Sequence, residues 1–235
     1  MKYAVDLHIH SALSPCADKD MTPNNIVNMA LIKGLDAIAV TDHNTGANLR
    51  ALDICARKAG LVFIPGIEVE SSEEVHMICL LPELERAQEL HLIVQHALPD
   101  IMNRPDIFGS QLIMDENDMT MGEEQRMLLT ATSLSIDDIC AAVRRLGGAV
   151  IPAHVDRTSY SIVSNLGFIP EELGFRYLEI SKRCDRYEYR SSRPELDRYR
   201  LIMSSDAHYL GDILERCNML ETEGLSADAI VRSLA

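Results

Sequence analysis

The feature that most constrains the fold is a series of histidines and carboxylates, each of which follows a short apolar run. The chain carries DLHIH at residues 6–10, near its start, and DAH at residues 206–208, near its end. Imidazole and carboxylate ligands together suit divalent zinc, manganese or iron. So many of them in 235 residues exceed the needs of one ion. The sequence therefore predicts a multinuclear metal centre whose ligands lie at strand ends.

Short apolar runs alternate with helical patterns, as is typical of a parallel α/β architecture. Thr22 and Pro23 open the first helix, Ser135 and Asp138 form a capping box on a later one, and Ser226 opens the last. Metal-type residues at the C-terminal ends of strands fit a (β/α) barrel, but a doubly wound open sheet binds ligands at the same ends. Strands are predicted at 2–10, 36–42, 61–68, 75–81, 148–153, 176–180, 200–205 and 217–220.

Residues 100–134 interrupt this alternation with several methionines and an acidic run at 115–118. We expect a short hairpin in which residues 111–114 pair with 119–121. A surface insertion is favoured over a lid or a dimer contact, because long insertions are well tolerated. With no linker or internal repeat, the sequence predicts one domain spanning residues 1–235.

The composition bears on partners and compartment. A net charge of −14 would repel a polyanion, and the single loose basic stretch is 182–200. Aromatic residues make up only 5%, so an aromatic and basic groove for nucleic acid is not indicated. We therefore expect a small phosphorylated substrate, with nucleic acid and membranes disfavoured. No signal peptide or spanning segment is seen, which predicts a cytoplasmic protein; the oligomeric state is not readable.

Spacing places several of the candidate ligands. Alternate residues share one face of a strand, so Asp6, His8 and His10 are expected to point the same way. The two imidazoles, about 6–7 Å apart along the strand, can converge on one ion or a close pair. Asp6 would then hydrogen-bond to an imidazole ligand on the side away from the metal, or it would be a solvated carboxylate. Glu68 can bridge two metals, but Glu70 shares its face, so spacing does not choose between them.

Other polar residues have competing interpretations. His76 lies inside an apolar run, where it could be a core histidine, whereas His154 ends its run as a ligand would. Asp42 could cap the helix that follows it. His91 and His96 fall in a predicted helix, and we interpret both as structural.

The order H-x-H, T-D-H, G-I-E, a strand histidine, P-A-H and S-D-A-H resembles the PHP (polymerase and histidinol phosphatase) superfamily, from His8 to His208. The resemblance implies a distorted (β/α)7 TIM-like barrel with two or three divalent metal ions (zinc, manganese or iron) at the C-terminal ends of the strands. It also implies phosphoester hydrolysis. By motif position it implies the ligands His8, His10, His43, Glu68, His76, His154, Asp206 and His208.

The loop after H-x-H departs from the family pattern. Many members carry a further ligand there, often Asp in an S-D-G loop, whereas the loop in this chain is longer. Counting back from Thr22 places Asp18 at that position, with Cys16 and Asp20 left open. A cysteine ligand would favour zinc or iron. The third ion depends on which residue is the ligand.

Paired metals about 3.5–4 Å apart activate water and clamp both in-line oxygens of a phosphoryl group. We therefore expect a metal-bridging hydroxide as nucleophile, without a covalent intermediate, in a phosphomonoesterase acting on a small metabolite or nucleotide. Arg157 and Arg183 are candidate phosphate contacts, with ordinary surface arginines as the alternative. A covalent route through Cys184 and Arg190 is rejected, because the intervening residues cannot form a nest of amides. A phosphodiesterase or exonuclease on nucleic-acid ends and a non-catalytic metal-bound scaffold are the alternatives.

Overall fold

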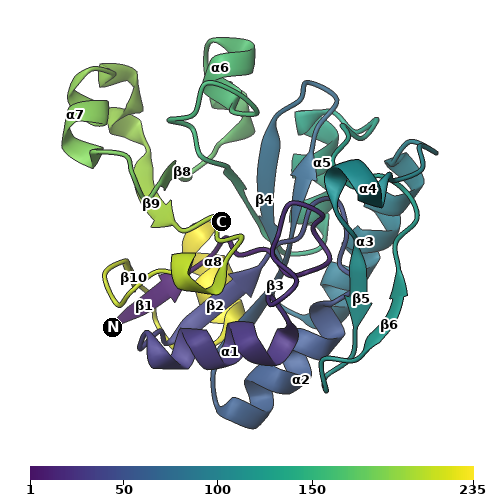
Figure 1. Ribbon diagram of the computed structural model, residues 1–235. Helices are drawn as coiled ribbons and strands as arrows, with labels where there is room; N and C mark the ends of the chain where they lie inside the picture. The colour runs from purple at the N-terminus through teal and green to yellow at the C-terminus, as the bar shows by residue number, and fades with distance from the viewer.

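The computed structural model describes residues 1–235, and its largest sheet has six strands in the order β10-β1-β2-β3-β4-β7 (Figure 1). β1, β2 and β3 pair in parallel, while β4 is antiparallel to both of its neighbours and β10 is antiparallel to β1. In chain order the six strands are β1 (Lys2–Asp6), β2 (Ala37–Val40), β3 (Val62–Glu70), β4 (His76–Leu80), β7 (Ala149–Pro152) and β10 (Met219–Glu221).

β8 (Tyr177–Ser181) and β9 (Arg200–Ser204) form a separate parallel pair that joins both sides of the larger sheet. Next to β7, the Val155 N–H donates to the Glu179 carbonyl at 2.8 Å. Next to β1, the His10 N–H donates to the Ala207 carbonyl at 2.9 Å. The circuit β1-β2-β3-β4-β7-β8-β9 confirms the expected distorted (β/α)7 barrel and excludes the open doubly wound sheet. Figure 1 shows β8, β9 and α7 at one side of the molecule.

The helix signals in the sequence act as expected. The Thr22 and Ser226 side chains accept the N–H groups of Asn25 and Ala229, and Ser135 forms its capping box. No helix is long and apolar enough to cross a membrane. The α-helices are α1 (Pro23–Ile32), α2 (Leu49–Ala59), α3 (Leu84–Ala97), α4 (Pro105–Phe108), α5 (Ile136–Arg145), α6 (Ile162–Leu166), α7 (Arg186–Ser191) and α8 (Ala227–Leu234). Short 3-10 turns are η1 (Glu171–Leu173), η2 (Pro194–Arg198) and η3 (Leu210–Asp212).

An apolar layer lies beneath the candidate ligands. A cluster of 16 buried residues combines alternate residues of the barrel strands, such as Ile64 and Ile78, with Ile230 of α8. By strand alternation Glu68 shares a face with Ile64, and His76 shares a face with Ile78. The sheet therefore carries apolar side chains on the same face as the ligands, farther from the ligand-bearing ends of β3 and β4. A larger cluster of 42 residues includes much of the contact between the strands and the outer helices.

The insertion contains the expected hairpin, formed by β5 (Leu112–Met114) and β6 (Thr120–Glu123). Its backbone is tied to the loop that follows β1, because the Leu112 N–H donates to the Ala12 carbonyl at 2.9 Å. The Asn48 side chain accepts the Met114 N–H at 2.9 Å. The insertion thus packs against the segment that carries the first candidate ligands.

Gly148 provides a test of the packing between α5 and β4. A Cβ atom there would lie 2.6 Å from the Leu80 carbonyl and 2.7 Å from side-chain carbons of Leu81 and Val143. We expect Gly148→Ala to lower the free energy of unfolding by about 1–3 kcal/mol in urea titrations, because backbone and core must shift. Gly122→Ala, whose Cβ meets no atom within 4 Å, should stay within about 0.5 kcal/mol of wild type. Equal losses in both variants would contradict this packing.

Candidate metal centre

Glu68, near the end of β3, lies at the centre of the site. Its side chain is 1% exposed, and Oε1 and Oε2 face different sets of imidazoles. The nearest ring nitrogens, those of His43 and His76, lie 2.9 Å away. Five histidines place a ring nitrogen within 2.9–3.4 Å of this carboxylate: His8, His10, His43, His76 and His154.

The segment after β9 completes the cluster. Asp206 Oδ1 lies 3.0 Å from His10 Nε2 and 3.4 Å from His8 Nε2. The His208 ring stacks on His10 with centroids 4.4 Å apart. All eight residues that the PHP resemblance implied as ligands are thus brought together, although they are spread over 200 positions of the chain. Glu70 stays at the margin, 3.8 Å from His76.

Hydrogen bonds fix which imidazole nitrogens face the cluster. His8 Nδ1 lies 3.0 and 3.1 Å from the two oxygens of Glu179, and His10 Nδ1 lies 3.0 Å from Ser14 Oγ. The Ser14 hydroxyl donates its one hydrogen to the Asp42 carboxylate at 2.7 Å, so its oxygen must accept a hydrogen bond from His10 Nδ1. Both imidazoles therefore carry a proton on Nδ1 and turn Nε2 towards the cluster.

The arrangement fits divalent cations. His8 Nε2 and His10 Nε2 lie 3.1 Å apart, close enough for both nitrogens to bind one cation. Two nitrogens bound to one zinc ion at 2.0–2.1 Å in tetrahedral geometry are roughly 3.3 Å apart. Both Glu68 oxygens are also buried without a hydrogen-bond partner, as are Nδ1 of His76 and of His154. Buried polar atoms left unpaired in this way are costly, and metal ligation would satisfy them.

The pKa shifts separate groups that already have their metal-binding form from imidazoles that hold a proton. Burial would raise the pKa of Glu68, but the imidazoles of His76, His8 and His43 hold that pKa well below its ordinary value, so the carboxylate is ionised. Burial, with help from His208 and His43, lowers the pKa of His10 well below its ordinary value, so this imidazole is neutral. Glu68 and His10 therefore have the forms that bind metal ions. Burial opposes a charge on the other imidazoles, but neighbouring carboxylates and Cys16 raise the pKa values of His8, His43, His76 and His208, so metal binding would displace a proton from these rings.

Glu179 on β8 was missed in the sequence analysis. Besides its contact with His8, it accepts the His154 N–H at 3.1 Å, and its side chain is buried. A carboxylate behind a ligating histidine fixes the ring orientation and makes the imidazole more basic. The signal was available, because Glu179 is a lone carboxylate within the apolar strand 177–180.

Asp6 and Asp42 have roles that differ from those expected. β1 ends at Asp6, so strict alternation does not extend to His8, and the predicted strand 2–10 was too long. The Asp6 carboxylate accepts the N–H groups of Ser205 and Leu214 at 3.0 Å and contacts no imidazole. It anchors the segment that carries Asp206. Asp42 caps no helix. Its carboxylate instead accepts hydrogen bonds from the backbone N–H and the hydroxyl of Ser11, which fixes the loop after His10.

Backbone strain concentrates at this site. Asn44, His154, Tyr160 and Asp206 all have positive φ angles, of 50°, 29°, 54° and 49°. Each either belongs to the cluster, follows one of its members or lines the adjacent cavity. Non-glycine residues in this region cost of order 1–3 kcal/mol each and persist where the surroundings enforce them.

A cavity of about 210 Å³ opens beside the cluster. Arg157 lines it and forms an ion pair with Asp206 Oδ2 at 2.6 Å, in keeping with its candidacy as a phosphate contact. Arg183 is exposed and is not among the lining residues. Tyr160 also lines the cavity, 48% exposed, with its ring stacked on His76 at a centroid distance of 4.9 Å.

The loop after H-x-H brings a thiol to the cluster in place of the expected carboxylate. Asp18 turns its carboxylate to the Asp20 N–H at 2.8 Å, so the structure does not bring it to the histidines. Cys16 Sγ lies 3.1 Å from His208 Nε2. Burial raises the pKa of this thiol, but hydrogen bonds with His208 and His43 outweigh that effect and lower it to about 6.

Comparison with known proteins supports the resemblance seen in the sequence. The family model of the PHP domain matches residues 6–161. The chain is 32% identical over 78 residues to a 5′-3′ exoribonuclease of Haemophilus influenzae, and 31% identical over 74 residues to a 3′,5′-nucleoside bisphosphate phosphatase of Chromobacterium violaceum. Each alignment covers 32% of this chain, and 27% and 25% of the relatives, so the chain spans about a quarter of their length.

The fold is similar to that of endonuclease Q in a complex with a 27-mer duplex that has an abasic lesion at its active site. The TM-score is 0.73 at 20% identity, over 99% of this chain and 56% of that one. Together with the exoribonuclease, this neighbour makes the expectation of a small phosphorylated substrate, with nucleic acid disfavoured, wrong. Net charge was a poor guide, because bound cations reverse the sign of a site within an acidic protein.

Glu179→Gln tests the support behind His8. The amide keeps an acceptor for the His154 N–H but loses the negative charge beside His8 Nδ1, so we expect metal affinity to fall by about 10–100-fold. Competition with a chromophoric chelator measures this affinity, and thermal unfolding checks the fold. Glu172→Gln, at an exposed position of η1, is the matched control. Unchanged affinity in Glu179→Gln would show that the carboxylate does not act on the metal centre.

Proposed function

The chain belongs to the PHP domain family, and from that premise we propose that it is a metal-dependent phosphodiesterase acting on nucleic acid. The single observation that carries the proposal is Glu68, a buried carboxylate without a hydrogen-bond partner among five imidazoles. Such a donor set is built for divalent cations, which are the usual catalysts of phosphoester hydrolysis.

We assign the metal ligands to the eight clustered residues, and Glu68 to the bridging position. Its Oε1 faces His8, His76 and His154, while its Oε2 faces His10 and His43, so each oxygen has its own set of imidazoles. Divalent ions bound there would lower the pKa of a water molecule and neutralise charge on the phosphoryl oxygens. Two or three ions suit this number of donors.

Arg157 is the side chain best placed to orient the phosphate. Its guanidinium pairs with Asp206 at the cavity wall, and its side chain is 44% exposed. A cation held by Asp206 would share its negative charge and would leave the Arg157 guanidinium free to bind a phosphate oxygen. Arginine suits this role because it holds two oxygens in a fixed geometry.

The cavity supports a substrate larger than a metabolite. Its volume of about 210 Å³ is below the roughly 300–1,000 Å³ of clefts that enclose a whole small ligand. A phosphoryl group and its immediate surroundings fill it, and the remainder of the substrate must lie outside. Tyr160 stands at the mouth, where the exposed part of its ring can stack on a nucleobase.

The substrate test compares esters under identical conditions. We expect manganese- or zinc-supported cleavage of end-labelled single-stranded RNA or DNA, and of bis(p-nitrophenyl) phosphate, all abolished by chelator. Asp206→Asn should lower turnover by at least about a hundredfold, because a metal ligand matters at least as much as its supporting residues. Asp228→Asn, exposed on α8, should leave turnover unchanged. Hydrolysis of p-nitrophenyl phosphate alone, or metal binding with no turnover of any ester, would refute the proposal.

Tyr160 gives a second test, directed at the nucleobase. Base–aromatic stacking is worth about 1–3 kcal/mol, so Tyr160→Ala should raise KM for an oligonucleotide by roughly five- to a hundredfold with little effect on kcat. Tyr160→Phe keeps the ring and should behave as wild type. Steady-state kinetics on one labelled oligonucleotide measures both values. Equal KM for Tyr160→Ala and wild type would mean that the ring does not contact substrate.

A further inference from the structure

Cys16 reaches the metal centre from a loop whose position is set by many hydrogen bonds. Asp42 holds Ser11 and Ser14 at the start of the loop. Farther along, the Asp18 N–H donates to the His208 carbonyl at 2.9 Å. The thiol lies between these anchors, so its place beside His208 follows from the framework of the loop.

The surroundings of the thiol are those of a metal site. Ligand atoms of His10, His43 and His208 all lie within 4.8 Å of one another. Cys16 Sγ lies beside this group and approaches His208 Nε2 at 3.1 Å. Independently of the cysteine, the unpartnered Oε2 of Glu68, on a side chain only 1% exposed, points to the same place, 2.9 Å from His43 Nδ1.

The carboxylates of the same loop do not compete for this place. The Asp18 carboxylate receives the Asp20 N–H, and Asp20 makes no contact with the histidines. Within 14–20, Cys16 is therefore the side chain that contacts His208, next to His43 in the cluster. The position that a carboxylate was expected to fill is occupied by sulfur.

We propose that Cys16, as a thiolate, binds one ion of the centre together with His43 and His208, and makes that position selective for zinc or ferrous iron over manganese. Thiolate is a soft ligand that prefers these ions, whereas carboxylate favours manganese. On binding, the S–H bond breaks, its proton passes to solvent, and the sulfur lone pair forms the metal bond. The inference rests on the metal centre of the proposed function.

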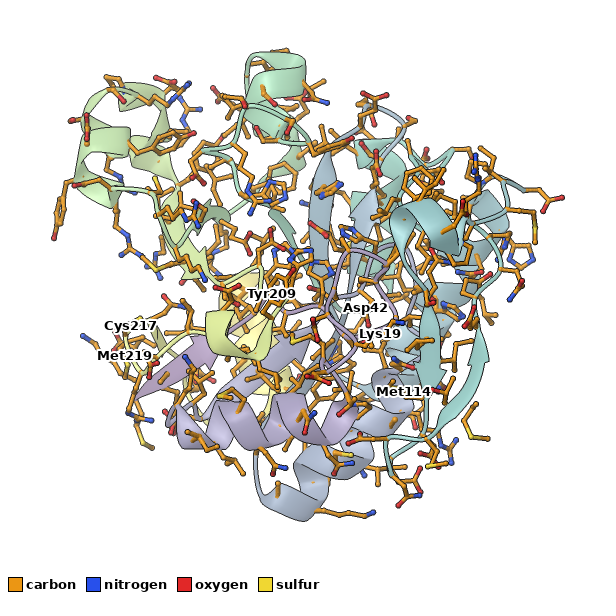
Figure 2. The ribbon with its side chains drawn as sticks, viewed as in Figure 1. Lys19, Asp42, Met114, Tyr209, Cys217 and Met219 are labelled. Carbon is orange, nitrogen blue, oxygen red and sulfur yellow. The ribbon has the colours of Figure 1, made fainter.

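Cobalt(II) in place of the native metals gives a readout that needs no turnover. Wild type should show a near-ultraviolet thiolate-to-cobalt charge-transfer band. Cys16→Ser should lose this band and should bind one ion fewer per chain at saturating cobalt. Cys217→Ser, altered at an exposed cysteine that Figure 2 shows well away from Asp42, should keep both. Circular dichroism checks the fold of each variant.

Cys16→Asp keeps the proposal testable if the serine variant folds poorly. It should retain the ion without the charge-transfer band and shift the zinc-to-manganese affinity ratio towards manganese, on the order of tenfold or more. Two results would overturn the role of Cys16 alone. One is wild type that binds cobalt with visible d–d bands but without the charge-transfer band. The other is a charge-transfer band that survives in Cys16→Ser. No cobalt binding at all would overturn the metal centre, and with it the proposed function.

Discussion

The structure depends on one buried carboxylate, Glu68, surrounded by imidazoles. A carboxylate in a protein interior costs several kcal/mol unless it is paired and fully coordinated. Much of the surrounding architecture serves this need. Histidines at or near strand ends face both oxygens of Glu68. Glu179 and Ser14 orient the rings of His8 and His10. Asp6 and Asp42 hold the backbone of the segments that carry candidate ligands. The positive φ angles of His154 and Asp206 are part of the same requirement.

Much of this could be predicted from the sequence, because the relevant signals are local. Apolar runs located the strands, Ser135 with Asp138 located a helix start, and ligands at strand ends located the site. What failed depended on contacts between distant segments. The partner of His8 lies 171 positions away on β8, and Asp6 turns to amides beyond residue 200. Spacing along one strand carries no information about either.

The errors about the loop and the substrate also have physical reasons. Asp18 fits by counting, but a turn directs its carboxylate to the Asp20 amide and leaves Cys16 facing the histidines. Net charge of −14 describes the whole surface, whereas a substrate meets one cleft. In that cleft the carboxylates of Glu68 and Asp206 could hold divalent cations, which would reverse the local sign of the charge. An acidic chain can therefore offer a polyanion a positive site.

The barrel has two seams, where the β8–β9 pair meets the larger sheet, and these seams have a consequence beyond catalysis. β8 and β9 share no hydrogen-bonded ladder with the larger sheet. The backbone hydrogen bonds near the seams include the one between Val155 and Glu179 and the one between His10 and Ala207. The ligands His8 and His154 come from one side of these seams, and Asp206 and His208 come from the other. Divalent ions held by these residues would join the two sides of each seam. Loss of such ions and opening of the barrel would then be linked events, and the free energy of metal binding would add to the stability of the fold.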